Sequence, residues 1–450
     1  MPRTGADTMD DTSASADPRG LQVLRAFAAS PAPDRAVEIV GSGAWGEGAA
    51  RAGWSSARLT SQTWRGASWA HELTVVVPRQ RCETGMMILW IDGGSRADVP
   101  AAGARLQAPP ADVVWLADLA CGAGMPAAVV NQVPCQPMFG RMVEDDLIAH
   151  SFAEYVRTGD ADWPLLLPMV KAVVAAMGAA AGISDGLGSP VERFVLGGAS
   201  KRGWTSWLAA AADDRVVGIV PAVIDMLRLE RHIPLQLEAF GGRMSEMLDD
   251  YTSRGIERLL ATPRGRELLD VVDPWSHRRA IPQPKIVALG TNDPYWPLGA
   301  LDLYRDGLAG PCAISYCANA GHGLPWNRLA GLLAAMARHT SGIAPLPELR
   351  WSFTAARDLA ASPGAFAPTL AALSCDQPPA EVLLWQASAP DRDFRRAQWH
   401  ATPVERGGLH FHATLRPPAG EWGAAFLECR FERAPHPLHL TTSVHLQPAG

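Results

Sequence analysis

Residues 194–204 read FVLGGASKRGW, and this stretch decides how the fold of the chain is interpreted. An apolar run typical of a β-strand is followed by two glycines, a serine and a segment that favours helix. A serine at a tight strand-to-helix turn projects its hydroxyl away from the sheet, as a nucleophile must. The match to the pattern G-x-S-x-G holds only in its first half, because Arg202 occupies the place of the last glycine. The alternative is an ordinary turn in which Ser200 caps the helix.

Two later strand ends supply the partners that a serine nucleophile needs. Residues 284–293 form a short apolar strand that opens into Gly-Thr-Asn-Asp, and residues 313–323 form a strand that leads to a histidine between two glycines. In an α/β-hydrolase the serine, the acid and the histidine follow in this order, each after a successive strand. The sequence therefore predicts a catalytic triad of Ser200, Asp293 and His322.

The acid has one competitor, because Asp225 also ends an apolar strand, at 220–224. Some hydrolases take their acid from that earlier position. Asp293 is favoured because its loop opens directly off a strand and His322 follows on the loop of the next one.

A glycine loop earlier in the chain predicts the oxyanion hole. The run MMILWI at 86–91 is typical of a parallel strand that is covered on both faces, and it ends in Asp-Gly-Gly-Ser. We predict that the backbone N–H groups of Gly93, Gly94 and Lys201 stabilise the oxyanion, Lys201 being the residue after the nucleophile. The alternative is a plain glycine turn.

Strands and helices alternate along most of the chain. Strands are expected near 86–91, 126–133, 193–197, 216–224, 284–290 and 312–318, and helices near 144–158, 164–181 and 203–212. Residues 54–80 alternate like strands and predict an antiparallel start of the sheet. The pattern predicts an α/β fold, namely an α/β-hydrolase-like, mostly parallel sheet flanked by helices.

Residues 226–283 are too long for one crossover helix, and their composition predicts a helical cap insertion over the site. Its candidate lining residues are Met226, His232, Phe240, Met244, Met247 and Tyr251, although packing among cap helices is the alternative for each.

The two ends of the chain differ in character from this core. Residues 1–20 are polar and acidic and predict a disordered tail, which leaves 21–345 for the hydrolase-like domain. Residues 346–450 contain short alternating runs punctuated by proline and glycine, which predict a small β-sandwich accessory domain. A carbohydrate-binding or partner-binding module is the alternative role. His410 and His412 share one strand face, but without nearby cysteines or a compact acidic partner we expect no metal site.

Composition limits the classes of partner. The 450 residues include 40 basic and 46 acidic residues, a net charge of −6, and no basic stripe, so no nucleic-acid partner is expected. The apolar stretch 164–183 is interrupted by Pro168 and Lys171, so we expect a buried helix and no membrane span. The seven cysteines form no Cys-x-x-Cys pair and are expected to be reduced. No phosphate loop or dinucleotide motif follows a suitable strand, so no cofactor is expected. The sequence makes no prediction of oligomeric state.

From about residue 50 to its end, the chain resembles the PhoPQ-activated pathogenicity-related proteins. The resemblance is carried by LTSQTW at 59–64, WAHEL at 69–73, QVPCQP at 132–137, GASKRGW at 198–204, VPAVID at 220–225, GTND at 290–293 and RDFR at 392–395. It implies an α/β-hydrolase-like fold with Ser200, Asp293 and His322 at the catalytic positions of the family. It also accounts for Arg202, because KRGW is similar to the family's own version of the turn. Members of the family tend to begin with a secretory leader, whereas residues 1–20 show no apolar stretch of that kind, and a cytoplasmic location is expected.

These observations predict a serine hydrolase that cleaves an ester or amide of a small molecule or peptide through an acyl-enzyme. A catalytically inactive binding or signalling protein of the same fold is the alternative, and an acyltransferase or peptidase would use the same triad. Arg202 and Trp204 are predicted to bind substrate, and the cations beside the nucleophile suggest an anionic group on it. The alternative is that Arg202 points into the protein and pairs with an acid from the cap.

Overall fold

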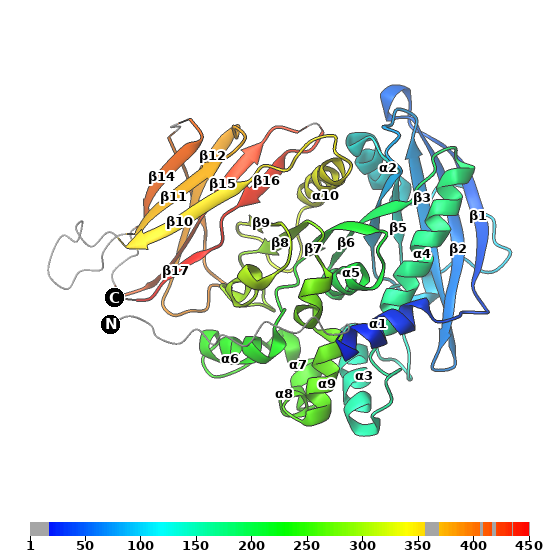
Figure 1. Ribbon diagram of the computed structural model, residues 1–450, viewed down its shortest axis with the longest axis horizontal. Coiled ribbons are helices and arrows are strands. Elements are labelled where there is room, and N and C mark those ends of the chain that lie inside the picture. Colours follow the sequence, from blue (N-terminus) through cyan, green and yellow to red (C-terminus); the bar gives the residue numbers. More distant parts are fainter. Residues whose placement is uncertain (1–17, 356–368, 406–407, 416–419, 434, 450) are drawn as a thin grey trace.

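A single large sheet runs through the molecule and positions the other elements (Figure 1). The computed structural model describes residues 18–355, 369–405, 408–415, 420–433 and 435–449. At one end of the sheet lie three antiparallel strands, β1 (Ala36–Trp45), β2 (Ala52–Trp64) and β3 (Ala67–Pro78). Strand β3 pairs antiparallel with a parallel core whose strands lie in the order β5 (Ala127–Val130), β4 (Met86–Ile91), β6 (Arg193–Ala199), β7 (Val216–Ala222), β8 (Lys285–Gly290) and β9 (Cys312–Cys317).

Helices cover both faces of the parallel core. One face carries α4 (Leu166–Gly186) and α5 (Lys201–Ala212), with α1 (Arg19–Ala29) packed on them, and the other carries α2 (Asp112–Ala123) and α10 (Trp326–Thr340). Helix α3 (Glu144–Thr158) packs against helices of the segment between β7 and β8. Successive strand residues point to opposite faces, so Leu89 of β4 belongs to the first core, whereas Trp90 packs on the other face against Trp326 of α10. The predicted α/β fold with a mostly parallel sheet between helices is confirmed, while α1 and α2 were not among the predicted helices.

Helix α4 is long and apolar enough to cross a membrane by length and composition alone. However, 72% of its most apolar window is buried inside the protein, and α4 packs against β2, β3 and α1. A helix that is buried between a sheet and other helices is apolar on all sides, because every side faces the protein interior. The composition of α4 is therefore that of a core helix.

The segment between β7 and β8 is helical, as predicted for the cap. It consists of α6 (Leu229–Ala239), η3 (Glu246–Leu248), α7 (Asp249–Thr252), α8 (Ile256–Leu260), α9 (Pro263–Val272) and η4 (Pro274–Ala280). The start of α9 follows the usual helix-capping rules, because the Thr262 hydroxyl accepts a hydrogen bond from the Gly265 N–H and Pro263 stands at the first helical position.

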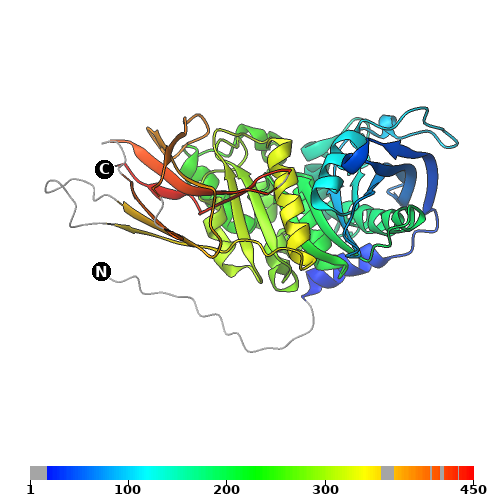
Figure 2. The same ribbon diagram turned by 90° about the horizontal axis from the view of Figure 1, so that it is seen from above.

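The C-terminal strands form two packed sheets, but they are not separate from the central sheet. Strands β12 (Glu381–Ala389), β13 (His400–Pro403), β15 (Trp422–Phe431), β16 (Leu438–Thr441) and β17 (His445–Gln447) extend it, because β16 pairs antiparallel with β9. The second sheet contains β10 (Leu349–Ala355), β11 (Thr369–Cys375) and β14 (His410–Leu415). The large sheet therefore crosses the predicted boundary at residue 346, and β16 covers what would otherwise be an open edge of β9. Seen from above, these strands lie at the opposite end of the molecule from β1 and β2 (Figure 2).

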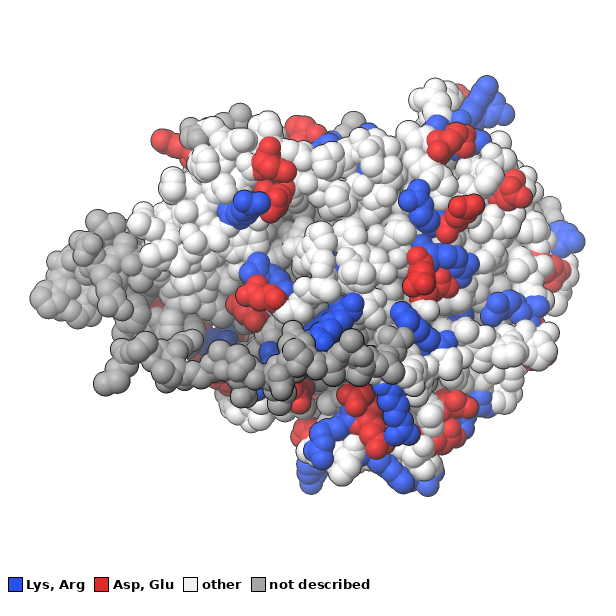
Figure 3. Space-filling model, in the orientation of Figure 1, with Lys and Arg blue, Asp and Glu red and all other residues white. Residues whose placement is uncertain are grey.

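Charged side chains of both signs are interspersed on the face shown in Figure 3, where many of them gather over the lower end that α3 and the cap helices form in Figure 1. The predicted tail, residues 1–20, lies outside the described residues as far as residue 17, and α1 begins at Arg19.

Candidate active site

Ser200 lies at the junction of β6 and α5, at the carboxyl end of the parallel strands. Its backbone angles are φ 56° and ψ −129°, a conformation that costs free energy for any residue with a side chain. Two glycines permit this turn. A side chain at Gly198 would approach the Arg202 backbone at 2.7 Å, and one at Gly203 would approach the Gly198 carbonyl oxygen at 2.8 Å. Gly203, which follows one residue after the last glycine position of the pattern G-x-S-x-G, therefore lets α5 approach β6 closely.

The loops after β8 and β9 bring Asp293 and His322 together. The Nδ1 atom of His322 lies 3.0 Å from Oδ1 and 2.9 Å from Oδ2 of Asp293, whose side chain is buried. Oδ1 also accepts a hydrogen bond of 2.9 Å from the Tyr295 N–H. A carboxylate held in this way fixes the imidazole with its Nδ1–H toward the acid and its Nε2 free to accept a proton.

The other ring nitrogen of His322 faces no protein partner. Nε2 is buried and has no hydrogen-bond partner among the described residues, and it is not hydrogen-bonded to the Ser200 hydroxyl. Such bonds are often long in enzymes without substrate. The Tyr295 ring lies next to both His322 and the cavity beside Ser200. It packs on the His322 ring with centroids 4.1 Å apart, and it is part of the cavity lining.

Asp225, the alternative acid, has different partners. It is buried, its Oδ1 accepts a hydrogen bond of 2.8 Å from the Tyr304 hydroxyl, and its backbone carbonyl lies 2.8 Å from Nε2 of His232. Burial raises the pKa of its carboxyl to about 8. Since His322 pairs with Asp293, the geometry favours Asp293 as the acid.

Replacement of Asp225 by asparagine should leave ester turnover largely intact and change the pH dependence of stability. A carboxyl whose pKa rises from 3.8 to about 8 on folding contributes stability that is fully present below the unfolded value. This contribution is lost as the pH rises through the folded value, so wild-type protein loses stability between about pH 4 and 8. Asparagine keeps the acceptor for the Tyr304 hydroxyl but carries no charge. The melting temperature of the variant, measured relative to that of wild type, should therefore be higher at pH 9 than at pH 5. A constant difference would contradict this account.

The glycine loop after β4 treats the three predicted oxyanion donors differently. The Gly93 N–H donates to Oδ1 of the neighbouring Asp92 at 2.7 Å, so this N–H is engaged in the present conformation, and the role of Gly93 as an oxyanion donor stays a prediction. Gly94 has a φ of 125°, which only glycine adopts easily, and its N–H has no hydrogen-bond partner among the described residues. The N–H of Lys201 opens α5, where the first N–H groups of a helix lack partners within the helix. Gly94 and Lys201 therefore stay as the predicted donors.

The cations beside the nucleophile are engaged by acids at the start of α3. Arg202 donates two hydrogen bonds of 2.7 Å to Glu144 and a third of 2.7 Å to the Val133 carbonyl oxygen. The Lys201 ammonium lies 2.7 Å from Glu144 and 3.4 Å from Asp145. Burial alone would raise the pKa of Glu144, but Arg202 and Lys201 outweigh it and hold this pKa at about 2. Arg202 therefore pairs with an acid, as in the alternative interpretation, but this acid belongs to α3 rather than to the cap, and a role of Arg202 in substrate binding stays a prediction.

A cavity of about 70 Å³ lies beside Ser200, between α3, α5 and the cap. Its apolar lining consists of Phe152, Trp204, Ile224, Met226, Leu229, Ile233, Met244, Leu248, Ile256, Leu260 and Trp296, and its polar lining of Asp145, Ser200, Lys201, His232, Tyr251 and Tyr295. Larger cavities, of about 330 and 590 Å³, lie against the C-terminal strands and contain none of the triad residues. Of these three cavities, the one beside Ser200 is the one that borders a predicted catalytic residue.

Four of the six predicted cap residues line this cavity together with Trp204. The exceptions are Phe240, whose ring lies 4.1 Å from the Arg395 guanidinium, and Met247, which is exposed. Sequence reasoning missed Asp145, Phe152 and the pair Tyr295–Trp296. The aromatic pair stands directly after the acid loop, which is a signal that would have found it.

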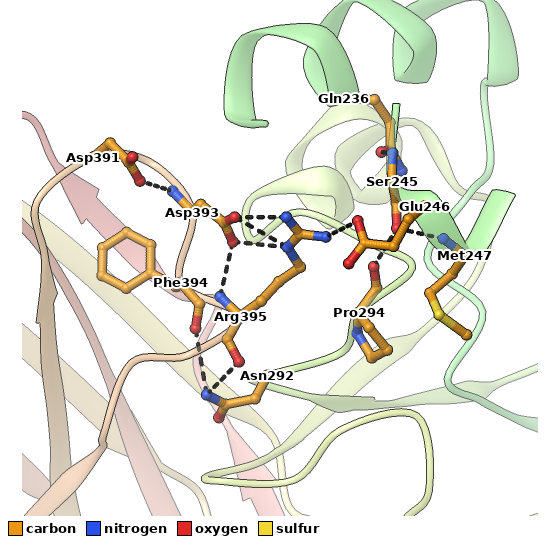
Figure 4. Close-up of polar contacts among 10 residues, drawn as sticks. All are labelled: Gln236, Ser245, Glu246, Met247, Asn292, Pro294, Asp391, Asp393, Phe394 and Arg395. Carbon is orange, nitrogen blue, oxygen red and sulfur yellow. Dashed lines mark hydrogen bonds and ion pairs between the residues drawn. The ribbon is translucent and has the colours of Figure 1, made fainter. Parts of the chain in front are cut away.

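The loop between β12 and β13, residues 390–399, contacts the loop that carries Asp293 (Figure 4) and the loop that carries His322. The Asn292 amide donates to the Ala397 carbonyl oxygen at 2.7 Å and lies 3.3 Å from the carbonyl oxygens of Phe394 and Arg395. Two hydrogen bonds, of 2.8 and 2.9 Å, join Asn319 to the backbone of Trp399.

The same segment reaches the cap. Figure 4 shows Arg395 between Asp393 and Glu246, and its bond to Glu246 measures 2.8 Å. Glu246 is largely exposed, so this ion pair contributes little stability. The hydrogen bonds of Asn292 and Asn319 therefore hold the loops that carry Asp293 and His322.

Asn292→Ala should lower kcat with little change in KM, because Asn292 precedes the acid and touches no part of the cavity lining. A displacement of about 1 Å in a catalytic group costs on the order of 10² in rate. Asn292→Asp should be no better than alanine, since it replaces the donor by an acceptor that faces carbonyl oxygens. The exposed Gln398 of the same segment offers the control Gln398→Ala. Equal kcat values for the Asn292 variants and this control would contradict a positioning role.

Among the residues that the structure describes, no group of three or more histidine, cysteine, aspartate or glutamate side chains could hold a metal ion. His410 and His412 lie exposed on β14.

The chain was compared with known proteins. Residues 49–395 match the family described as PhoPQ-activated pathogenicity-related protein. Autocrine proliferation repressor protein A of Dictyostelium discoideum is 29% identical over 406 residues, which are 83% of this chain and 79% of that protein.

Two esterases are among the similar solved structures. Acetyl xylan esterase from Paenibacillus sp. R4 has a TM-score of 0.45 and 14% identity and covers 69% of this chain and 91% of its own. Glucuronoyl esterase from Solibacter usitatus has a TM-score of 0.41 and 16% identity, and the match covers 71% of this chain and 92% of that esterase. Because the family match extends over most of the sequence, the chain belongs to the PhoPQ-activated pathogenicity-related protein family.

Proposed function

We propose that this protein is a serine hydrolase that cleaves an ester or amide bond through an acyl-enzyme, with Ser200, His322 and Asp293 as its triad. The observation that carries the proposal is the pairing of His322 Nδ1 with both carboxylate oxygens of Asp293, at 3.0 and 2.9 Å. The strained turn at Ser200 and the cavity beside it support the assignment of the nucleophile.

In the proposed first step, Ser200 Oγ attacks the substrate carbonyl carbon and its proton moves to Nε2 of His322. Asp293 holds the imidazole by Nδ1 and stabilises the imidazolium that forms. The N–H groups of Gly94 and Lys201 stabilise the oxyanion, each such donor being typically worth about 2.7–4 kcal/mol. When the tetrahedral intermediate collapses, His322 returns the proton to the departing alcohol or amine. Water then attacks the acyl-enzyme and gives a proton to His322, which returns it to Ser200 Oγ as the bond to the acyl group breaks, and the acid and free Ser200 are released.

Turnover of a small activated ester as a function of pH tests this function. The neutral imidazole accepts the Ser200 proton, so kcat/KM should be higher on the alkaline side of the profile than on the acid side. His322→Ala is the comparison. A wild-type profile that matches the profile of this variant would mean background reactivity, and would favour the alternative of a non-catalytic binding protein.

A further inference from the structure

We propose that the cavity beside Ser200 binds a short, uncharged, apolar group of the substrate, so that esters of short aliphatic acids are the preferred substrate class. This inference rests on the proposed function of the site. It follows from three properties of the cavity: the ring N–H groups of its two tryptophans are bonded within the protein, its charges are paired, and its volume is small.

The ring N–H groups that border the cavity are satisfied by the protein. Trp204 Nε1 donates to the Val272 carbonyl oxygen at 2.6 Å, and Trp296 Nε1 donates to the Val223 carbonyl oxygen at 3.1 Å. A substrate hydroxyl placed in this cavity would lose its bonds to water and find neither of these groups free. Burial of an unpaired polar group costs free energy, so such a substrate is disfavoured.

The titratable groups of the lining are paired in the same way. The Tyr251 hydroxyl donates to Asp145 at 3.1 Å, and Asp145 lies 3.4 Å from the Lys201 ammonium. His232 Nε2 lies 2.8 Å from the Asp225 carbonyl oxygen, and burial lowers the pKa of His232 to about 4, so this ring is neutral at neutral pH. The cavity therefore offers no uncompensated charge to an anionic or cationic group.

The remaining wall is apolar and comes from both the core and the cap. Trp204 of α5 and Phe152 of α3 pack edge to face, with centroids 6.0 Å apart, and the cap adds Met244, Ile256 and Leu260. A cavity of about 70 Å³ is small compared with the roughly 300–1,000 Å³ of most ligand pockets. A cavity needs about 10–15 Å³ of this kind of volume for each water-sized group, so this one holds about five such groups. An acyl chain of about four carbons is therefore the size of group that fits without movement of the cap.

The test is kcat/KM for 4-nitrophenyl esters from acetyl to decanoyl, together with the charged succinyl ester. Each added methylene that is buried should raise kcat/KM about fourfold, from acetyl to butanoyl. The value should fall at octanoyl and beyond, and the succinyl ester should be at least about tenfold poorer than butanoyl, since its carboxylate would be buried without a partner.

Two methionines of the cap give matched variants. Met244 lines the cavity, whereas Met247 is exposed and does not. Met244→Ala should move the optimum toward hexanoyl or longer chains, and Met247→Ala should leave it at butanoyl. A flat chain-length series, a preference for the succinyl ester, or an equal shift in both variants would overturn the inference while the hydrolase function stands.

Binding without turnover separates the two claims. In Ser200→Ala, calorimetry should detect binding of 4-nitrophenyl butanoate, and the bulky Met244→Trp substitution, added to this variant, should abolish it. Absence of binding of this ester to Ser200→Ala would overturn the inference. Binding of the ester to Ser200→Ala together with no ester turnover by the wild-type protein would instead count against the proposed function.

Discussion

Ser200→Ala should lower kcat for an activated ester by on the order of 10⁶, the loss typical of removing a triad nucleophile. The other hydroxyls of the lining are poor substitutes: those of Tyr251 and Tyr295 face Asp145, and burial raises the pKa of Tyr295 to about 12. The measurement is initial-rate kinetics on a 4-nitrophenyl ester.

The fold of this variant serves as its control. Alanine has no larger side chain than serine, so the turn at φ 56° should be retained and the melting temperature should stay close to that of wild type. An intact variant with turnover within tenfold of wild type would show that Ser200 is not the nucleophile.

Asp293→Asn should lower kcat by about 10⁴, because asparagine keeps the shape of the acid but favours the wrong tautomer of the histidine. In the wild type both carboxylate oxygens lie about 3 Å from His322 Nδ1. Because these oxygens are acceptors, they stabilise the tautomer that carries its proton on Nδ1. The asparagine amide can instead donate to Nδ1, which places the proton on Nε2, where it blocks transfer from Ser200.

Asp225→Asn is the matched control, since both acids are buried and both follow parallel strands. If the Asp225 variant loses more activity than the Asp293 variant, the acid role moves to Asp225 and the geometry of the His322–Asp293 pair has been misinterpreted.

The parallel core was predictable because its strands are continuous apolar runs with characteristic loops. Strand β4 is buried at all six of its residues, and β8 likewise, so both stand out in the sequence without any periodicity. The union of the C-terminal strands with the central sheet was not predictable. It depends on the pairing of Thr441 with Ile314, a contact between segments that no local pattern links.

The positions of the three proposed catalytic residues in the fold were predictable for a related reason. Ser200, Asp293 and His322 each stand at the end of a strand, and parallel strands place their carboxyl ends at one edge. The surroundings of the triad were not predictable, because they depend on long-range pairs. Arg202 is read from the sequence as a free cation beside the nucleophile, yet Glu144 neutralises it from 58 positions away in the chain.

Labelling with a fluorophosphonate, followed by tryptic mapping, tests the central claim most directly. Cleavage after Arg193 and Lys201 releases residues 194–201, FVLGGASK, a peptide in which Ser200 is the sole serine. The account predicts that the label is found on this peptide in the wild-type protein, is absent in Ser200→Ala and forms more slowly in His322→Ala. A label on another peptide, or folded wild-type protein that takes up no label, would contradict it.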